Sequence, residues 1–200
     1  MKVNGDYMNN ETKIREFLKN NYGYITTSDF LNLSISKPLI KKYIDNGLIR
    51  KVSHGIYMDI NLLIDDEYVF QKRYPEAIFS YKTALNMLGY IKEKPRLKEI
   101  TINSKKRVLS DYKVHYVSDK YYNIGIIETK NMFGNPIKLY NIERCICDML
   151  KNNDFELELQ NNILHDYFGS NEKDIYKLLE YSKLFNVYDK VSTLVDYAVR

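Results

Sequence analysis

Residues 47–57 read GLIRKVSHGIY, and this stretch decides how the N-terminal part of the chain folds. Two short runs of apolar and β-branched residues, 48–52 and 56–58, lie on either side of a Ser-His-Gly connection. A three-residue connection with a glycine available for a positive φ is typical of a tight β-hairpin. The sequence therefore predicts a hairpin whose first strand carries Arg50 and Lys51.

Two helices and a very short strand are predicted well upstream of this hairpin. Apolar residues at helical spacing predict a first helix over residues 11–20. Residues 24–25 are long enough only for a strand stub. A short second helix is expected over residues 29–33, with Thr27 or Ser28 as its N-cap, because hydroxyl side chains satisfy the free N–H groups of a first turn.

A third helix is predicted directly before the hairpin. Ser36 is a natural N-cap, and Pro38 is tolerated in a first helical turn. Asn46 and Gly47 supply the stop signal at the other end. Three helices followed by a hairpin are the order of a winged helix-turn-helix, in which the hairpin is the wing.

Positive charge is concentrated in this part of the chain. Residues 1–58 contain 9 Lys and Arg against 5 Asp and Glu, a net charge of +4. The whole chain has 30 basic and 26 acidic residues, also a net +4, so the other 142 of its 200 residues are neutral overall. A localised positive field is the footprint of a phosphate-binding surface, because Lys and Arg release counterions condensed on DNA. We therefore expect the N-terminal third to bind double-stranded DNA.

The third helix is the expected DNA-binding surface. Ile40, Tyr43 and Ile44 form its buried stripe, which leaves a basic face outward for the major groove. Hydroxyl groups near the start of the second helix would hold a phosphate, and the hairpin would lie along the backbone or in the minor groove. The alternative is that the lysines of the third helix form an ordinary solvated surface that binds no DNA. The expected DNA-contacting residues are Thr26, Thr27, Ser28, Lys37, Lys41, Lys42, Arg50, Lys51, Ser53 and His54.

The rest of the chain predicts a mixed α+β domain with a small sheet and C-terminal helices. Strands are expected over residues 98–103, 112–117, 124–129 and 137–140, and helices over 77–88, 142–150, 157–168, 174–185 and 187–199. The predicted fold class is thus α+β, with a winged helix-turn-helix domain over residues 1–60 and an α+β domain over residues 61–200.

Composition excludes several other classes. No stretch approaches the roughly 20 consecutive apolar residues of a membrane span, and the polar N-terminus is unlike a signal peptide, so we expect a cytoplasmic protein. Cys145 and Cys147 lie two positions apart in a helical pattern, where they point to different sides; reduced, structural thiols are expected. No cofactor motif occurs, and none is expected to be needed.

Three blocks of this sequence resemble one family of bacterial regulators. Residues 47–57 are similar to the wing of the AbiEi-type antitoxins, which often reads Gly-x-Leu-x-Arg-Val-x-Arg-Gly-Val-Tyr. Residues 77–85, with Gly89-Tyr90 after them, resemble its Ala-x-x-Ser-x-x-Ser/Thr-Ala-Leu helix, and residues 140–150 its Glu-Arg-Thr-x-x-Asp-Leu-Leu helix. The resemblance continues through residues 183–199 and so spans most of the chain.

This resemblance implies a two-domain antitoxin of a type IV abortive-infection system, which acts in phage defence. Its winged helix would repress its own operon at an operator with inverted repeats, and its partner would be a nucleotidyltransferase-like toxin. Two positions depart from the family pattern: His54 and Lys51 stand where Arg is usual. Lys keeps the charge but loses the planar fork of Arg, and His is mostly neutral at physiological pH.

Two alternatives remain open. The chain could be a stand-alone winged-helix transcription factor whose second domain senses a ligand or dimerises, and a toxin gene beside its own would separate these readings. Glu128 and Lys130 could instead form a Mg²⁺-dependent nuclease site with Asp111 or Asp119. Common residues produce such a tripeptide easily in a Lys-rich chain, so we expect no enzymatic activity.

Glu143, Arg144 and Asp148 also invite a site hypothesis. Arg144 and Asp148 are four residues apart in a predicted helix, however, and residues at that spacing lie on the same helical face. An ion pair that braces the structure explains them better than a site does. The three isolated histidines are likewise expected to be ordinary surface or core residues.

Overall fold

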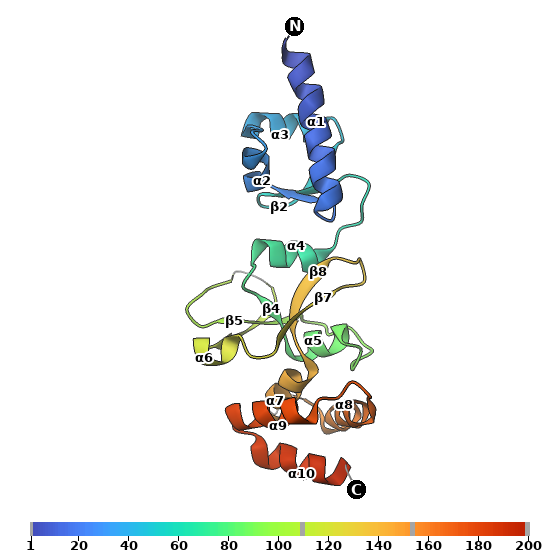
Figure 1. Ribbon diagram of the computed structural model, residues 1–200, viewed down its shortest axis with the longest axis vertical. Coiled ribbons are helices and arrows are strands. Elements are labelled where there is room, and N and C mark those ends of the chain that lie inside the picture. Colours follow the sequence, from blue (N-terminus) through green and yellow to red (C-terminus); the bar gives the residue numbers. More distant parts are fainter. Residues whose placement is uncertain (1, 109–110, 153–154, 199–200) are drawn as a thin grey trace. The chain divides into compact units, whose positions relative to one another are not determined.

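The computed structural model describes residues 2–108, 111–152 and 155–198, and these residues form an α+β protein with two sheets (Figure 1). Contacts divide the chain into two compact units. Unit 1 comprises Met1–Pro75 with Met132–Asn135, and unit 2 comprises Glu76–Asn131 with Pro136–Arg200. None of the described helices combines the length and the apolar character needed to cross a membrane. The boundary at residue 60 stays a prediction about independently folding domains.

Unit 1 contains three helices, a three-stranded sheet and a fourth helix. Its elements are α1 (Lys2–Asn20), β1 (Tyr24–Thr26), α2 (Thr27–Asn32), α3 (Lys37–Asp45), β2 (Ile49–Ser53), β3 (Ile56–Asp59) and α4 (Asp66–Arg73). The sheet is antiparallel with the order β1-β3-β2, and β2 has a bulge between Lys51 and Ser53. Apolar side chains of α1, α2, α3 and β2 make the core, among them Ile14, Phe30, Ile40, Tyr43 and Ile49.

The predicted elements of this unit are largely present. The second and third helices and both hairpin strands lie within one or two residues of their predicted positions. The first helix begins well before residue 11, because the polar residues ahead of it have no apolar periodicity to reveal them. Helix α4 was not predicted. Its N-cap Asp65 accepts a hydrogen bond from the Tyr68 backbone N–H at 3.1 Å.

Unit 2 is a mixed five-stranded sheet followed by helices. Its elements are β4 (Ile78–Phe79), α5 (Tyr81–Met87), β5 (Glu99–Asn103), β6 (Lys113–Val117), α6 (Asp119–Tyr122), β7 (Ile126–Lys130), β8 (Pro136–Tyr140), α7 (Ile142–Lys151), α8 (Leu157–Gly169), α9 (Ile175–Leu184) and α10 (Tyr188–Ala198). The strand order is β6-β5-β4-β8-β7. The predicted strands and C-terminal helices are confirmed to within a few residues; Val199 of the last predicted helix lies outside the described residues.

The predicted helix over residues 77–88 is wrong in its first part. Ile78 and Phe79 form the central strand β4, in which Phe79 pairs antiparallel with Ile100 and parallel with Leu139. A short apolar run fits a buried strand as well as a helix, and periodicity alone does not separate the two. The helix starts only at Tyr81, whose φ of 49° sets the break between strand and helix.

Gly125 is required where β7 approaches the start of α7. Its φ is +82°, and an added Cβ would lie 2.7 Å from the Cβ of Arg144 and 2.7 Å from Oδ1 of Asn141. We expect Gly125→Ala to lower the free energy of unfolding by about 2–3 kcal/mol, because left-handed strain and overpacking act together. Chemical denaturation would measure this loss.

Gly89→Ala is the matched control for that substitution. Gly89 has a φ of +85°, but nothing lies within 4 Å of an added Cβ. Gly89→Ala should therefore lower the free energy of unfolding by only about 1–2 kcal/mol, the cost of the left-handed backbone conformation alone. Equal losses in the two variants would contradict the close contact with Arg144 and Asn141.

Candidate nucleic-acid interface

Helix α3 presents its basic residues to solvent. Ile40 and Tyr43 are buried against the core of unit 1 on the opposite side of the helix. The side chains of Lys37, Lys41 and Lys42 are all exposed. This nine-residue helix thus exposes three ammonium groups; the helical spacing predicts Lys41 and Lys42 on the side away from the core and Lys37 at its flank.

The start of α2 differs from its prediction in one respect. The N-cap is Thr26 and not Thr27 or Ser28. The Thr26 hydroxyl accepts a hydrogen bond from the Asp29 backbone N–H at 3.2 Å. In return, the backbone N–H of Thr26 donates to the Asp29 carboxylate at 2.8 Å. This capping box uses the groups of Thr26 that were predicted to hold a phosphate, and it adds a negative charge beside them. Ser28 remains exposed at the helix start.

The hairpin turn is joined to the start of α2. The Thr27 backbone N–H donates to the Gly55 carbonyl at 2.9 Å, and Gly55 has a φ of +69° that the turn requires. His54, at the tip of the turn, and Lys51, on β2, are exposed, whereas Ser53 is half-buried. The structure therefore brings the turn of the hairpin and the first residues of α2 together.

Arg50 is placed differently from the other basic residues of the hairpin. Its guanidinium donates to the carbonyl of Leu62, in the segment that follows β3. The side chain is half-buried, and its Nε is shielded from solvent with no hydrogen-bond partner. Arg50 is thus engaged within unit 1, where it contacts the segment that follows β3; its DNA contact stays a prediction.

Helix α4 adds a lysine that sequence analysis did not single out. Lys72 is half-buried, and its Nζ lies 5.1 Å from the centre of the Tyr68 ring. Burial lowers the pKa of Lys72, while the charge of Asp29 acts in the opposite direction. The residue therefore offsets part of the negative charge that Asp29 places at the start of α2. No local sequence signal marks this electrostatic interaction, because α4 and α2 are distant in the chain.

The residues of the nuclease alternative do not come together. Glu128 and Lys130 are exposed on β7, at one edge of the five-stranded sheet. Asp111 and Asp119 flank β6, at the opposite edge, and Asp119 is bound by Lys105 and Asn103. Within the described ranges, no three His, Cys, Asp or Glu side chains are arranged to hold a metal ion.

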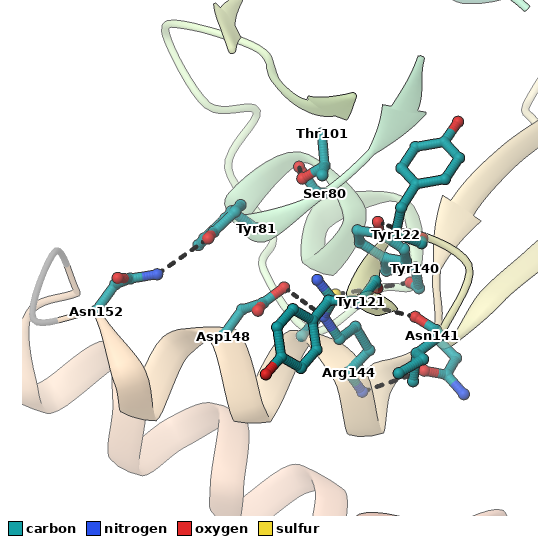
Figure 2. A network of polar contacts seen from close by, with 12 residues as sticks. Ser80, Tyr81, Thr101, Tyr121, Tyr122, Tyr140, Asn141, Arg144, Asp148 and Asn152 are labelled. Carbon is teal, nitrogen blue, oxygen red and sulfur yellow. Dashed lines mark hydrogen bonds and ion pairs between the residues drawn. The ribbon is translucent and has the colours of Figure 1, made fainter. Parts of the chain in front are cut away.

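Unit 2 contains a buried polar network around Arg144 (Figure 2). The guanidinium of Arg144 donates to Asp148 at 2.9 Å and to the carbonyls of Tyr121 and Ile124 at 2.8 and 2.9 Å. The rings of Tyr140 and Phe185 lie 4.2 and 4.1 Å from its Cζ. Nε and Nη1 of Arg144 both have internal acceptors, and the ring contacts add Tyr140, so this network joins α6, β8 and α7. The ion-pair interpretation is confirmed.

The histidines and cysteines follow their predicted behaviour. His54 and His165 are exposed, and Nε2 of His115 lies 2.7 Å from the carboxylate of Glu99. Cys145 and Cys147 are both free thiols in the core of unit 2. Burial raises the pKa of Cys147 to about 12 and that of Cys145 as well, so neither thiol is a nucleophile at neutral pH.

No protein-family model matches this sequence, and no curated protein is similar enough to it to count as a relative.

Proposed function

We propose that this protein is a DNA-binding antitoxin that represses its own operon and counteracts a nucleotidyltransferase-like toxin. In this proposal unit 1 is a winged helix-turn-helix, with α3 as the recognition helix and the β2–β3 hairpin as the wing. The observation that carries the DNA-binding part is the outer side of α3, where Lys37, Lys41 and Lys42 are exposed opposite a buried apolar side.

The geometry refines the set of proposed DNA contacts. The lysines of α3 come first, because they are exposed on one helix in a unit of net positive charge. Lys51 and His54 of the hairpin come second, since both are exposed. Arg50 and Thr26 are less suited to DNA contacts, because their polar groups already bind Leu62 and Asp29.

The antitoxin part of the proposal rests on the resemblance of three sequence blocks to AbiEi-type antitoxins. Two of these blocks fall in unit 2, where they form β4 with α5 and the buried helix α7. Residues in those blocks, such as Arg144 and Asp148, hold the fold of unit 2. We therefore assign toxin antagonism to unit 2 and repression to unit 1.

A separation-of-function experiment tests both parts. The full chain would be expressed with a reporter under the promoter of its own operon, and separately with the toxin encoded beside it. We expect the wild-type chain to lower reporter output and restore growth. A variant with Lys37, Lys41 and Lys42 changed to Ala should restore growth but no longer repress, because only its groove-facing charge has changed.

The two parts can fail independently. A wild-type chain that does not repress the reporter would refute the DNA-binding part, whereas one that represses but does not restore growth would refute the antitoxin part. A variant that folds but loses both activities would show that toxin antagonism depends on DNA binding. Lys92, Lys94 and Lys130, all exposed in unit 2, give a charge-matched alanine control that should still repress.

A further inference from the structure

Unit 2 contains an open groove with a volume of about 560 Å³. It is lined by the residues that follow α5, by β7, by the first turn of α7, and by the end of α8 with the start of α9. Leu88, Ile127 and Ile142 give it apolar walls, and Tyr90 adds an aromatic ring. These segments are distant in the sequence, so the groove exists only in the folded unit.

A buried carboxylate, Glu143, lies in this groove. Glu143 is only 3% exposed, and it is one of the residues that line the groove. The N-cap of α7 is the Asn141 side chain, which accepts a hydrogen bond from the Arg144 backbone N–H, so Glu143 is not needed for capping. The described structure gives its carboxylate one hydrogen bond, a long one of 3.4 Å from the Tyr167 hydroxyl. A carboxylate has about four acceptor sites, so most of its capacity is unused.

The other charges of the groove leave it acidic. Asp174 caps α9 through the Lys177 backbone N–H at 2.9 Å and also binds the Lys177 Nζ at 2.9 Å. Among the described lining residues Lys177 is the only base, and it is already paired. Asp166 and Glu172 are exposed at the rim. Glu143 and Glu172 form no ion pair within 4 Å among the described residues, although the charge of Lys177 also acts on Glu143. Asp166 has only His165 beside it, with Nδ1 at 3.4 Å, so the acids of the groove outnumber its cations.

This combination selects one kind of ligand. The groove acids are not arranged as a metal-binding group in the described residues, which disfavours a small ion. Apolar walls beside a buried carboxylate fit a cation on an alkyl arm, whose stem packs while its head is bound. A planar guanidinium can bind a carboxylate through two parallel hydrogen bonds. The two rim acids offer further positions for neighbouring cations.

We infer that this groove binds an arginine-bearing segment of a partner protein, with one guanidinium on Glu143 and flanking basic residues at Asp166 and Glu172. The apolar stem of that arginine packs on Leu88 and Ile142. This site is separate from the basic surface of α3, and it stands whether or not unit 1 binds DNA.

The test uses the full chain and a fluorescein-labelled, end-capped peptide of alternating glycine and arginine. Binding would be followed by fluorescence anisotropy. Glu143→Gln is expected to weaken the peptide affinity about tenfold or more, because a charge-assisted hydrogen bond in a buried site is lost. The glutamine keeps an oxygen that can accept from the Tyr167 hydroxyl, and thermal unfolding would verify that the variant folds.

A rim variant and a control complete the design. Glu172→Lys changes an exposed position and should weaken binding severalfold even if Glu143→Gln does not fold. Glu180→Gln removes an exposed acid of α9 that does not line the groove and should leave affinity unchanged. A matched peptide with citrulline in place of arginine should bind at least tenfold more weakly, because its side chains are uncharged.

Three results would overturn the inference. Equal losses in Glu143→Gln and Glu180→Gln would indicate general attraction between opposite charges. Equal binding of the citrulline peptide would show that charge is not what the groove recognises. Spermidine that displaces the peptide at equal concentration would assign the groove to small amines and not to a protein segment.

Discussion

Changing Lys37, Lys41 and Lys42 together to alanine is expected to weaken duplex DNA binding on the order of 100-fold in 0.1 M salt. Each lysine that meets a phosphate contributes about 0.9 to the slope of log K against log salt concentration, so the slope should fall by up to about 3. The side chains are exposed, so the fold should not change. Anisotropy titrations of the operon's promoter fragment at several salt concentrations would measure both quantities.

The control for this prediction is the alanine variant of Lys92, Lys94 and Lys130, which loses the same charge from unit 2. We expect at most a few-fold weakening there. If both triple variants lose affinity equally, net charge and not the surface of α3 governs binding. An unchanged slope in the α3 variant would mean that these lysines contact no phosphate.

The second large effect concerns the stability of unit 2. Replacing Arg144 by Met should lower the free energy of unfolding by about 3–5 kcal/mol, because Asp148 stays buried without its counter-ion. Two backbone carbonyls and two aromatic rings also lose their contacts with the guanidinium. Thermal unfolding should show a midpoint about 10–15 °C lower.

An exposed ion pair of the same geometry is the control. Arg15 and Glu11 are also four residues apart on a helix, at 2.8 Å against 2.9 Å for Arg144 and Asp148. Their side chains are 59% and 31% exposed, whereas those of the buried pair are 1% and 6% exposed. Arg15→Met should therefore cost less than about 1 kcal/mol. Similar losses in the two variants would contradict the role of burial.

A double variant separates the charge from the packing. Burial raises the pKa of Asp148 although Arg144 opposes it, so the ion pair offsets only part of the desolvation. Arg144→Met combined with Asp148→Leu removes the stranded charge and should be more stable than Arg144→Met alone. A double variant as unstable as the single one would assign the loss to the carbonyl and ring contacts of Arg144.

The sequence was most informative where local signals agree. In α3, a serine N-cap, a proline in the first turn and a terminal Asn-Gly mark the ends, and the apolar spacing marks the buried side. The hairpin is similarly marked by Gly55 between two short apolar runs. Both predictions depend only on residues within one helix or one hairpin, so they can be made without knowledge of tertiary contacts.

Other features depend on partners that are remote in the chain. The hydrogen bond from Arg50 to the carbonyl of Leu62 was not predicted, because no sequence pattern marks that approach. The Thr26-x-x-Asp29 spacing did carry a local signal for the capping box, with aspartate in place of the usual glutamate. The acidic groove was not predictable, since its walls come from segments between residues 88 and 177.

The position of β4 at the centre of its sheet has a consequence for synthesis on the ribosome. In unit 1, β1 pairs with β3 through Tyr24 and Met58, which are 34 residues apart in the chain. In unit 2, the edge of β4 at Phe79 is covered only after Leu139 of β8 has been synthesised, 60 residues later. Closing a longer stretch of chain costs more entropy and takes longer. Nascent chains therefore carry an uncovered Ile78-Phe79 edge while residues 80–139 are synthesised, and we expect aggregation or chaperone binding to begin at this edge.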